Sequence, residues 1–151
     1  MKKIFFAAIV SIALNSCTRE YYNEKNEVFV NSETISYTVK SYADSARDFI
    51  WEIYEDATGA YYYCDIEEPK LTSEVFEYGI MNAYLSYELN KANILAPLPY
   101  SDFIVDNNRK WEEQLSVEFY VGHITFILKY DDHTKHAPYF SSYDFLVRFM
   151  W

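Results

Sequence analysis

The polar cluster Asp131-Asp132-His133-Thr134-Lys135-His136 is the stretch of this sequence whose residue types could most directly bind a metal. His133 and His136 stand three positions apart beside Asp131, and imidazole and carboxylate groups are common ligands of divalent metals. Zinc sites in proteins use three or four protein ligands, whereas Lys135 lies between these two histidines and no further histidine is near in sequence. A solvated loop between two strands is therefore the favoured interpretation, and we expect neither a metal nor another cofactor.

Aromatic side chains are the second group that could bind a ligand, because exposed tyrosine and tryptophan rings can stack on sugar rings. Aromatic residues make up 20% of the chain, and sixteen of them are tyrosines. The candidates for such a surface are Tyr61, Tyr63, Tyr100 and Trp111, and Trp51, Tyr62 and Tyr84 are further aromatic residues that could join them. For Trp51 a place in the hydrophobic core is favoured, since large aromatic rings are highly buried on average.

Three carboxylates before Pro69, namely Asp65, Glu67 and Glu68, could form a calcium site or an acid/base pair. A solvated turn explains them more simply, because acidic residues are usually exposed and this chain is strongly acidic. The sequence therefore assigns them no catalytic role.

His123 and Cys64 are the remaining side chains with reactive groups. His123 follows Gly122 at the start of an expected strand and is expected on the surface, pointing away from the apolar face that begins with Ile124. Cys64 lies in a tyrosine-rich strand, where a lone cysteine behaves as a small buried hydrophobe. No G-x-S-x-G, H-E-x-x-H, P-loop or dinucleotide-binding motif is present, so we assign no catalytic residue.

The first seventeen residues have the pattern of a bacterial lipoprotein signal. Lys2 and Lys3 precede an eleven-residue apolar run from Ile4 to Leu14, which is too short to span a bilayer, since that takes about 20 residues. Small Ser16 then precedes Cys17, as in a lipobox. We therefore expect 1–16 to be cleaved and Cys17 to be acylated, although an ordinary secretory signal with an incidental cysteine would share the leader.

Net charge restricts the partners of the mature chain. The leader contains Lys2 and Lys3 and no acidic residue, so its removal changes the formal net charge from −10 to −12. Such an acidic chain argues against nucleic acid or anionic lipid headgroups as partners. Attachment to the membrane must then come from the lipid on Cys17. Because that lipid uses one of two cysteines, Cys64 remains unpaired and a disulfide within the monomer is excluded.

The rest of the chain is expected to be a short tether, 17–27, followed by one domain, 28–151. Alternating apolar and polar residues predict strands at 34–40, 49–54, 61–66, 80–88, 117–121, 124–130 and 145–151. A turn is expected at 56–59, a short helix at 71–78 capped by Thr72 or Ser73, a bend at Gly122, and loops at 90–100 and 131–138. Helical spacing is an alternative for 80–88, and the last strand is expected at the centre of its sheet. The fold class is therefore mainly β: a single antiparallel β-sandwich of about seven or eight strands with one short helix.

Several short landmarks occur together in this domain. They are Trp51, Tyr61-Tyr62-Tyr63, Pro69, Leu71-Thr72, Gly79, Tyr84, Leu98-Pro99, Gly122 and a closing Phe145-Leu146-Val147 strand. In these features residues 34–151 resemble the small uncharacterised β-sandwich lipoproteins of the Bacteroidetes. The resemblance implies an outer-membrane location, on its periplasmic or outer side, and a β-sandwich fold. It implies no activity and no catalytic residue. Asp44-Ser45-Ala46 also matches the short O-glycosylation pattern of these bacteria.

Three functions are compatible with these observations. The first is a lipid-anchored binding module for a protein or a glycan, and the second is a structural accessory subunit of a surface assembly, joined by strand addition. The third and least favoured is a hydrolase using loop carboxylates, which would need a deep pocket with convergent acids and shifted pKa values.

We predict that Cys17→Ala abolishes both membrane partitioning and incorporation of labelled fatty acid, because the acyl chains are the only expected attachment. Fractionation of labelled cells, with the unsubstituted chain as control, measures both. A Cys17→Ala variant that stays in the membrane fraction and still takes up label would refute the lipoprotein assignment.

Overall fold

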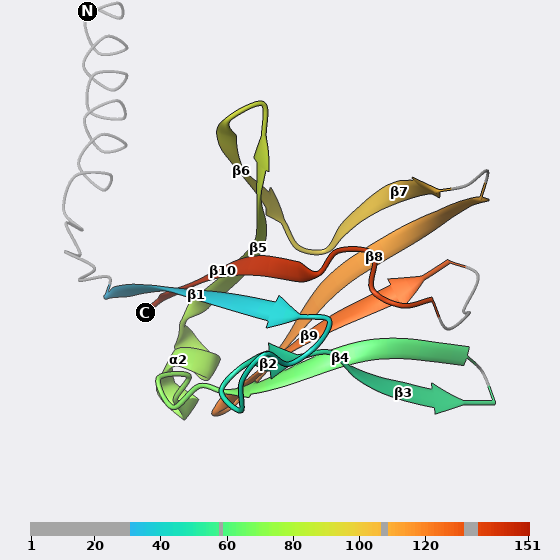
Figure 1. The fold of residues 1–151 in the computed structure, drawn as a ribbon. Coiled ribbons are helices and arrows are strands. Elements are labelled where there is room, and N and C mark those ends of the chain that lie inside the picture. Colours follow the sequence, from blue (N-terminus) through green and yellow to red (C-terminus); the bar gives the residue numbers. More distant parts are fainter. Residues whose placement is uncertain (1–30, 58, 107–108, 132–135) are drawn as a thin grey trace, which may run out of the picture. The chain divides into compact units, whose positions relative to one another are not determined.

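The computed structural model describes residues 31–57, 59–106, 109–131 and 136–151, and all structural statements below concern these residues (Figure 1). The predicted signal peptide at 1–16, Cys17 and the tether at 17–27 lie outside them. The described part forms ten strands and one short helix. They are β1 (Ser32–Lys40), β2 (Phe49–Ile50), β3 (Glu52–Asp56), β4 (Gly59–Glu67), α2 (Ser73–Tyr78), β5 (Ile80–Leu89), β6 (Ala92–Pro97), β7 (Tyr100–Asp106), β8 (Arg109–Tyr120), β9 (His123–Tyr130) and β10 (Ser142–Met150).

Two five-stranded sheets make up the fold, and the predicted β-sandwich class is confirmed. The first sheet has the order β2-β1-β10-β5-β6 and the second has the order β3-β4-β9-β8-β7. Neighbouring strands are antiparallel except β1 and β2, which pair in parallel. Figure 1 shows the β5–β6 hairpin rising on one side and the β7–β8 pair extending to the right. The expectation that the C-terminal strand is central is also confirmed, since β10 lies third in its sheet.

The chain crosses between the sheets at two short junctions. Trp51 alone separates β2 from β3, so the predicted single strand at 49–54 is in fact two strands in different sheets. Leu98 and Pro99 make the second junction, between β6 and β7, and the peptide bond joining them is cis. Both junctions bring apolar side chains into the space between the sheets, because Trp51 is buried and Leu98 packs on the core.

The core consists of the inward-facing residues of both sheets. The rings of Phe126 in β9 and Phe145 in β10 stack across the interface, with centroids 4.0 Å apart and planes 12° from parallel. Trp51 meets the edge of Phe145, with centroids 6.3 Å apart, which confirms its predicted place in the core. Large aromatic and branched side chains alternating along the strands therefore hold the two sheets together.

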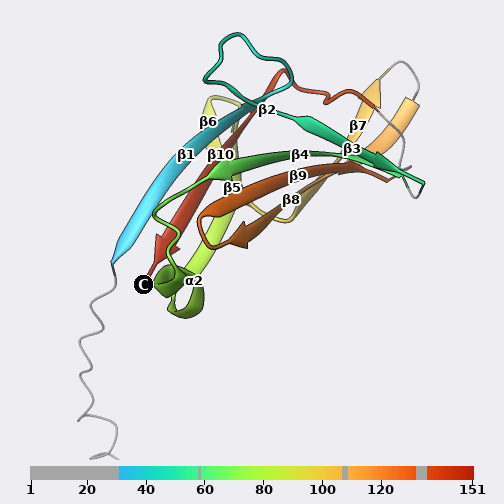
Figure 2. The same cartoon turned by 90° about the horizontal axis from the view of Figure 1, so that it is seen from below.

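Helix α2 and β5 follow the predicted local pattern. Thr72 caps the helix, since its Oγ1 accepts a hydrogen bond from the backbone N–H of Val75 at 3.3 Å. The N–H of Gly79 donates to the carbonyl of Val75 at 2.9 Å and ends the helix. The strand prediction for 80–88 is confirmed by β5, and Figure 2 shows α2 next to the C-terminal end of the chain.

The predicted loop at 90–100 is wrong, because it contains β6 and the start of β7. Asn90 and Lys91 form the turn between β5 and β6, with φ values of 52° and 66°. Two-residue hairpin turns of this kind usually carry glycine, so Asn-Lys gave little indication of one. Pro97 ends β6 at the edge of the sheet, where its missing N–H costs no ladder hydrogen bond.

The strand before Gly122 is also longer than expected. β8 begins at Arg109, although the sequence predicts a strand only from Val117. The strand β7 was not predicted at all. In both strands a carboxylate, Asp102 or Glu113, occupies an inward-facing position and interrupts the apolar alternation.

The two ends of the domain meet at one end of the first sheet. Asn31 and Trp151 exchange two backbone hydrogen bonds, with N···O distances of 2.7 and 3.0 Å. From there β1 and β10 run side by side in opposite directions, from Ser32 opposite Met150 to Lys40 opposite Ser142.

We predict that Gly79→Ala lowers the free energy of unfolding by about 1–3 kcal/mol, the range for overpacking. A Cβ at Gly79 would lie 2.4 Å from the carbonyl oxygen of Val75 and 2.9 Å from that of Met150, and both are backbone atoms. Urea unfolding measures the change. Gly122→Asn is the matched control, because Gly122 has φ +82° with open space around it and asparagine tolerates that backbone conformation. Equal stability of the two variants would contradict the prediction.

Candidate functional site

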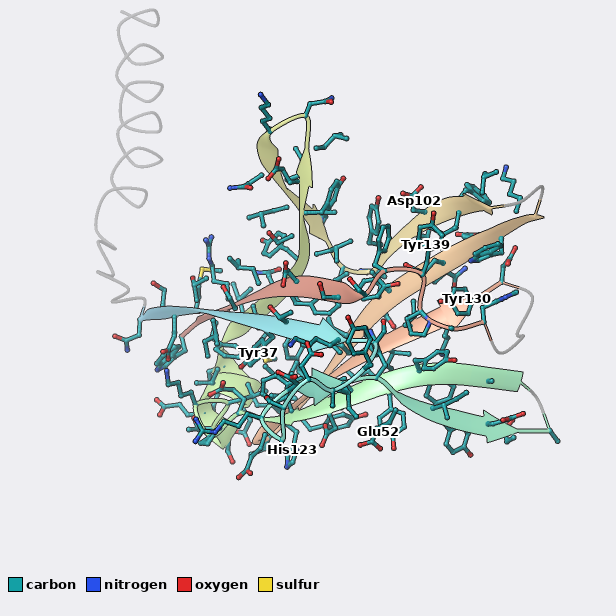
Figure 3. The ribbon with its side chains drawn as sticks, in the orientation of Figure 1. Tyr37, Glu52, Asp102, His123, Tyr130 and Tyr139 are labelled. Atoms are coloured by element: carbon teal, nitrogen blue, oxygen red, sulfur yellow. The ribbon has the colours of Figure 1, made fainter. Side chains whose placement is uncertain are left out.

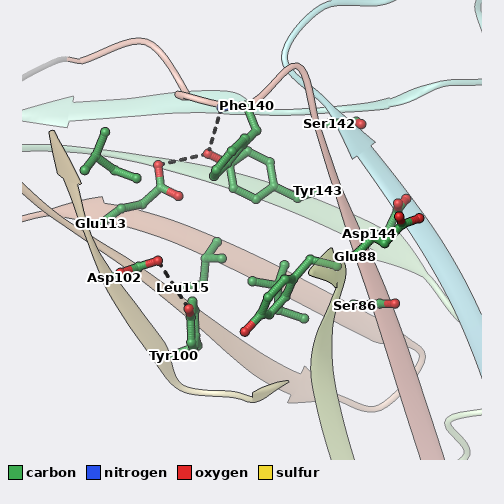
Figure 4. Close-up of a pocket in the computed structure, with 13 residues that line it drawn as sticks. Ser86, Glu88, Tyr100, Asp102, Glu113, Leu115, Phe140, Ser142, Tyr143 and Asp144 are labelled. Carbon is green, nitrogen blue, oxygen red and sulfur yellow. Dashed lines mark hydrogen bonds between the residues drawn. The ribbon is translucent and has the colours of Figure 1, made fainter. Parts of the chain in front are cut away.

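A pocket of about 380 Å³ lies where the ends of the two sheets diverge (Figure 4). From the first sheet it is lined by Leu85, Ser86, Tyr87 and Glu88 of β5 and by Ser142, Tyr143 and Asp144 of β10. The second sheet contributes Tyr100, Asp102 and Ile104 of β7 and Glu113 and Leu115 of β8, and Phe140 comes from the connection before β10. Sites of this size and mixed lining are typical of small-molecule binding.

Strand pairing explains why the pocket forms at this place. β5 pairs with β10 only as far as Ser86, which lies opposite Asp144. Beyond that point Tyr87 to Leu89 pair with β6 alone. The β5–β6 hairpin therefore leaves β10 there, and β7, the last strand of the second sheet, borders the resulting space.

Glu113 is the buried polar residue of the pocket, with 4% of its surface exposed. Its Oε2 accepts a hydrogen bond from the hydroxyl of Tyr143 at 2.9 Å and lies 3.2 Å from the hydroxyl of Tyr130. The Tyr130 hydroxyl is equally close, 3.2 Å, to the carbonyl oxygen of Ala137, so its single proton is shared between two acceptors. Burial raises the pKa of Glu113, and the tyrosine hydrogen bonds oppose that rise without cancelling it.

One further carboxylate faces the same space, because Asp102 lies directly across the β7–β8 ladder from Glu113. Glu88 and Asp144 belong to the first-sheet border of the pocket, but their side chains lie on the outer face of that sheet (Figure 4). Asp144 accepts a hydrogen bond from Thr38 Oγ1 at 2.6 Å, and Asp102 accepts one from the backbone N–H of Phe103 at 2.8 Å.

Neither Asp102 nor Glu113 forms an ion pair with a cation in the described part of the chain. The ion pairs among the described residues are made by Lys40, Lys70 and His123, and none of them involves a pocket carboxylate. The pocket is therefore a region of negative potential. Consistent with this, burial and the nearby charge of Asp102 raise the pKa of Tyr100 to about 12.

Aromatic rings form two walls of the pocket. Tyr87 and Tyr100 lie with their ring centroids 6.3 Å apart at one side, across the gap between the two sheets. Phe140 and Tyr143 meet edge to face at the other side, with centroids 5.6 Å apart. Aromatic rings and the carboxylates of Asp102 and Glu113 thus line one cavity, which suits a ligand with an apolar body and polar or positive groups.

The predicted aromatic candidates fall in three separate places. Tyr100 lines the pocket. Tyr61 and Tyr63 lie on the outer face of the second sheet, where Tyr61 stacks on Tyr54 at 5.0 Å and the Tyr63 hydroxyl donates to Glu52 at 2.7 Å. Figure 3 shows Glu52 at the lower side of the molecule, away from Asp102.

Trp111 is the third place, and it lies beside His136 of the polar cluster that the sequence interprets as a solvated loop. The ring of Trp111 stacks on His136 with centroids 5.1 Å apart and planes 11° from parallel, and Tyr130 meets the same imidazole edge to face. Asp131 accepts a hydrogen bond from the backbone N–H of Glu112 at 3.1 Å. Within the described residues no three metal-ligating side chains gather. His133 lies outside the described residues, so the interpretation of its cluster as a solvated loop stays a prediction.

The predicted solvated turn at Asp65, Glu67 and Glu68 is wrong for Glu68. That residue is buried and its carboxylate accepts hydrogen bonds from the Tyr37 hydroxyl at 2.5 Å and from the backbone N–H of Lys70 at 3.1 Å. Asp65 is exposed and contacts His123 Nδ1 at 3.0 Å, which confirms the expected surface position of the histidine.

Cys64 is buried as predicted, and burial raises the pKa of its thiol to about 12, so it is not poised for nucleophilic chemistry. Ser45, in the glycosylation pattern, lies exposed in the connection between β1 and β2. No helix in the described part of the chain has the length and apolar character needed to cross a bilayer.

The residues that sequence reasoning missed are Glu113, Asp102, Glu88 and Asp144. One indication was available: Glu113 interrupts an otherwise apolar alternation that runs from Trp111 to Phe119. A charged residue at an inward position needs a local reason, and hydroxyl partners beside a cavity supply it here.

We predict that the chain becomes less stable as pH rises through the folded-state pKa of Glu113. Because this pKa is raised on folding, the native state binds more protons than the unfolded state above about pH 4, the usual range of a glutamate. Glu113→Gln should remove this part of the decline. Tyr143→Phe should steepen it, because it deletes a donor to the carboxylate. Thermal unfolding between pH 4 and pH 8 tests this, and parallel profiles for all three chains would contradict it.

No protein-family model, curated protein or solved structure matched this chain when each was compared with it.

Proposed function

We propose that this chain is a lipid-anchored protein of the bacterial outer membrane whose β domain is a binding module, with its ligand site in the pocket between the sheets. The observation that carries the proposal is the pocket itself, whose volume of about 380 Å³ suits a small molecule or one end of a glycan. Its walls combine aromatic rings with hydrogen-bonding carboxylates and hydroxyls. Rings can pack against the apolar faces of a ligand while the polar groups fix its orientation.

The position of the pocket supports a binding role. It lies at the divergent ends of two sheets whose remaining inner faces are packed, so the surrounding strands hold its walls in place. Tyr87, Tyr100 and Tyr143 come from three different strands and converge on it. A site built on strands of a rigid scaffold needs little reorganisation to bind, which favours affinity.

Hydrolysis is the weaker alternative for the same residues. Asp102 and Glu113 form a cross-strand carboxylate pair, and the pKa of Glu113 is raised, which are features of acid/base sites. However, Oε2 of Glu113 is engaged by tyrosine hydroxyls that donate to it, and such donors favour the charged carboxylate over a proton donor. The contacts of Glu113 therefore support binding more than proton transfer.

The localisation part of the proposal rests on the sequence. The basic start, the apolar run and the lipobox before Cys17 support acylation, and the landmarks shared with small Bacteroidetes lipoproteins support the outer membrane. The acidic composition supports partners other than nucleic acid.

A structural accessory subunit is the second candidate function, and one observation favours it. β7 is an edge strand of the second sheet and exposes 58% of Phe103 and 67% of Val105 on its surface. An apolar edge strand can accept a strand from another chain, so this edge could join the domain to an assembly.

We predict that Asp102→Trp abolishes glycan or small-molecule binding while the fold remains intact, because an indole at this exposed position, directly across the ladder from Glu113, would fill the pocket mouth. Binding to a broad glycan and metabolite panel measures the effect. Asp65→Trp, at an exposed aspartate on the outer face of the second sheet, is the matched control.

The opposite outcome is equally informative. Attachment to an envelope assembly that survives Asp102→Trp but is lost on Val105→Lys would overturn the pocket proposal and favour the accessory subunit.

A further inference from the structure

We infer that the group held in the pocket is an organic cation, namely an amine carried on an apolar or ring-shaped body. This inference rests on the proposed function, since it names the chemical class of the ligand for the same pocket. It is drawn from the charges of the lining residues, from the placing of the aromatic rings and from the apolar surface between them.

The charge of the lining is one-sided. Asp102 and Glu113 face the cavity from the second sheet, and none of the thirteen lining residues is a lysine, arginine or histidine. The wall of the cavity that the second sheet forms is therefore negative (Figure 4). Like charges in a partly desolvated space repel one another, and a bound cation relieves this repulsion. An anionic ligand would increase it.

The aromatic rings supply the second component of cation recognition. Tyr87 and Tyr100 on one side and Phe140 and Tyr143 on the other side present ring surfaces to the same space. The face of an aromatic ring attracts a positive charge, and aromatic cages are a recurrent solution for binding amines. Carboxylates alone would not distinguish an amine from a metal ion, whereas rings together with carboxylates favour the amine.

The apolar residues of the lining determine the rest of the ligand. Leu85, Ile104 and Leu115 also line the cavity, so part of its surface offers no hydrogen bond. A bare metal ion would leave this surface uncovered. Moreover, no three carboxylate, histidine or cysteine side chains gather on one point within the described ranges, as a metal would require. An amine attached to a ring or a short apolar chain matches both parts of the lining.

The test uses three probes of nearly the same size and different charge: benzylamine, benzyl alcohol and benzoate. Titration calorimetry on the purified full-length chain in a non-ionic detergent at pH 7 gives the three dissociation constants. We expect benzylamine to bind about tenfold more tightly than benzyl alcohol, the effect of one charge-assisted hydrogen bond, and benzoate to bind weakest. Added salt should weaken benzylamine binding more than benzyl alcohol binding.

Substitution of a pocket carboxylate then assigns the effect. Asp102→Asn keeps the side-chain size at an exposed position, so the chain should fold, and it should weaken benzylamine about tenfold while changing benzyl alcohol little. Asp65→Asn is the matched control, because Asp65 is an exposed carboxylate on the outer face of the second sheet and should leave all three constants unchanged.

The outcomes separate this inference from the proposed function. Equal binding of benzylamine and benzyl alcohol, lost in Asp102→Trp, would overturn the cation inference while the pocket remains the ligand site. Failure of all three probes would overturn the cation inference as well, and the pocket proposal would then depend on the glycan and metabolite panel. Amine binding that is unaffected by Asp102→Asn would show that the amine binds elsewhere and would also overturn it.

Discussion

The contact between the inner faces of the two sheets is the interaction on which the whole domain depends. At its centre Phe126 and Phe145 stack at 4.0 Å, and Trp51 closes one side of this contact from the junction between β2 and β3. The buried Cys64 is the only cysteine among the described residues, so no disulfide supplements this packing there. Burial of apolar surface at roughly 25 cal/mol per Å² must therefore offset most of the conformational entropy lost on folding.

The same packing explains where a polar site can exist. The inner faces are closed wherever both sheets contribute large apolar residues, and they separate where β5 leaves β10 after Ser86. Glu113 lies at this boundary. Its burial is unfavourable in isolation, but hydroxyl groups from Tyr143 and Tyr130 stabilise its carboxylate. The cavity is thus the part of the interface in which side-chain chemistry, rather than close packing, determines the residue types.

Sequence patterns predicted the elements in which alternation is regular, including β1, β4, β9 and β10, and they predicted the helix from Thr72 and Gly79. They failed where a carboxylate, rather than an apolar side chain, occupies an inward-facing position of a strand. Asp102 and Glu113 interrupt the inward apolar row, so β7 and the first half of β8 lacked the pattern of a strand. The pocket could not be predicted, because it joins residues from β5, β7, β8 and β10, and local patterns carry no information on which distant strands become neighbours.

The pairing of Asn31 with Trp151 fixes where the chain enters the first sheet relative to the pocket. Ser32, the first residue of β1, lies opposite Met150 of β10, whereas the pocket is bordered by Asp144, six residues away along the same strand. At about 3.3 Å per residue these two positions are roughly 20 Å apart. The entry of the chain and the opening of the pocket are therefore separated by most of the length of β10.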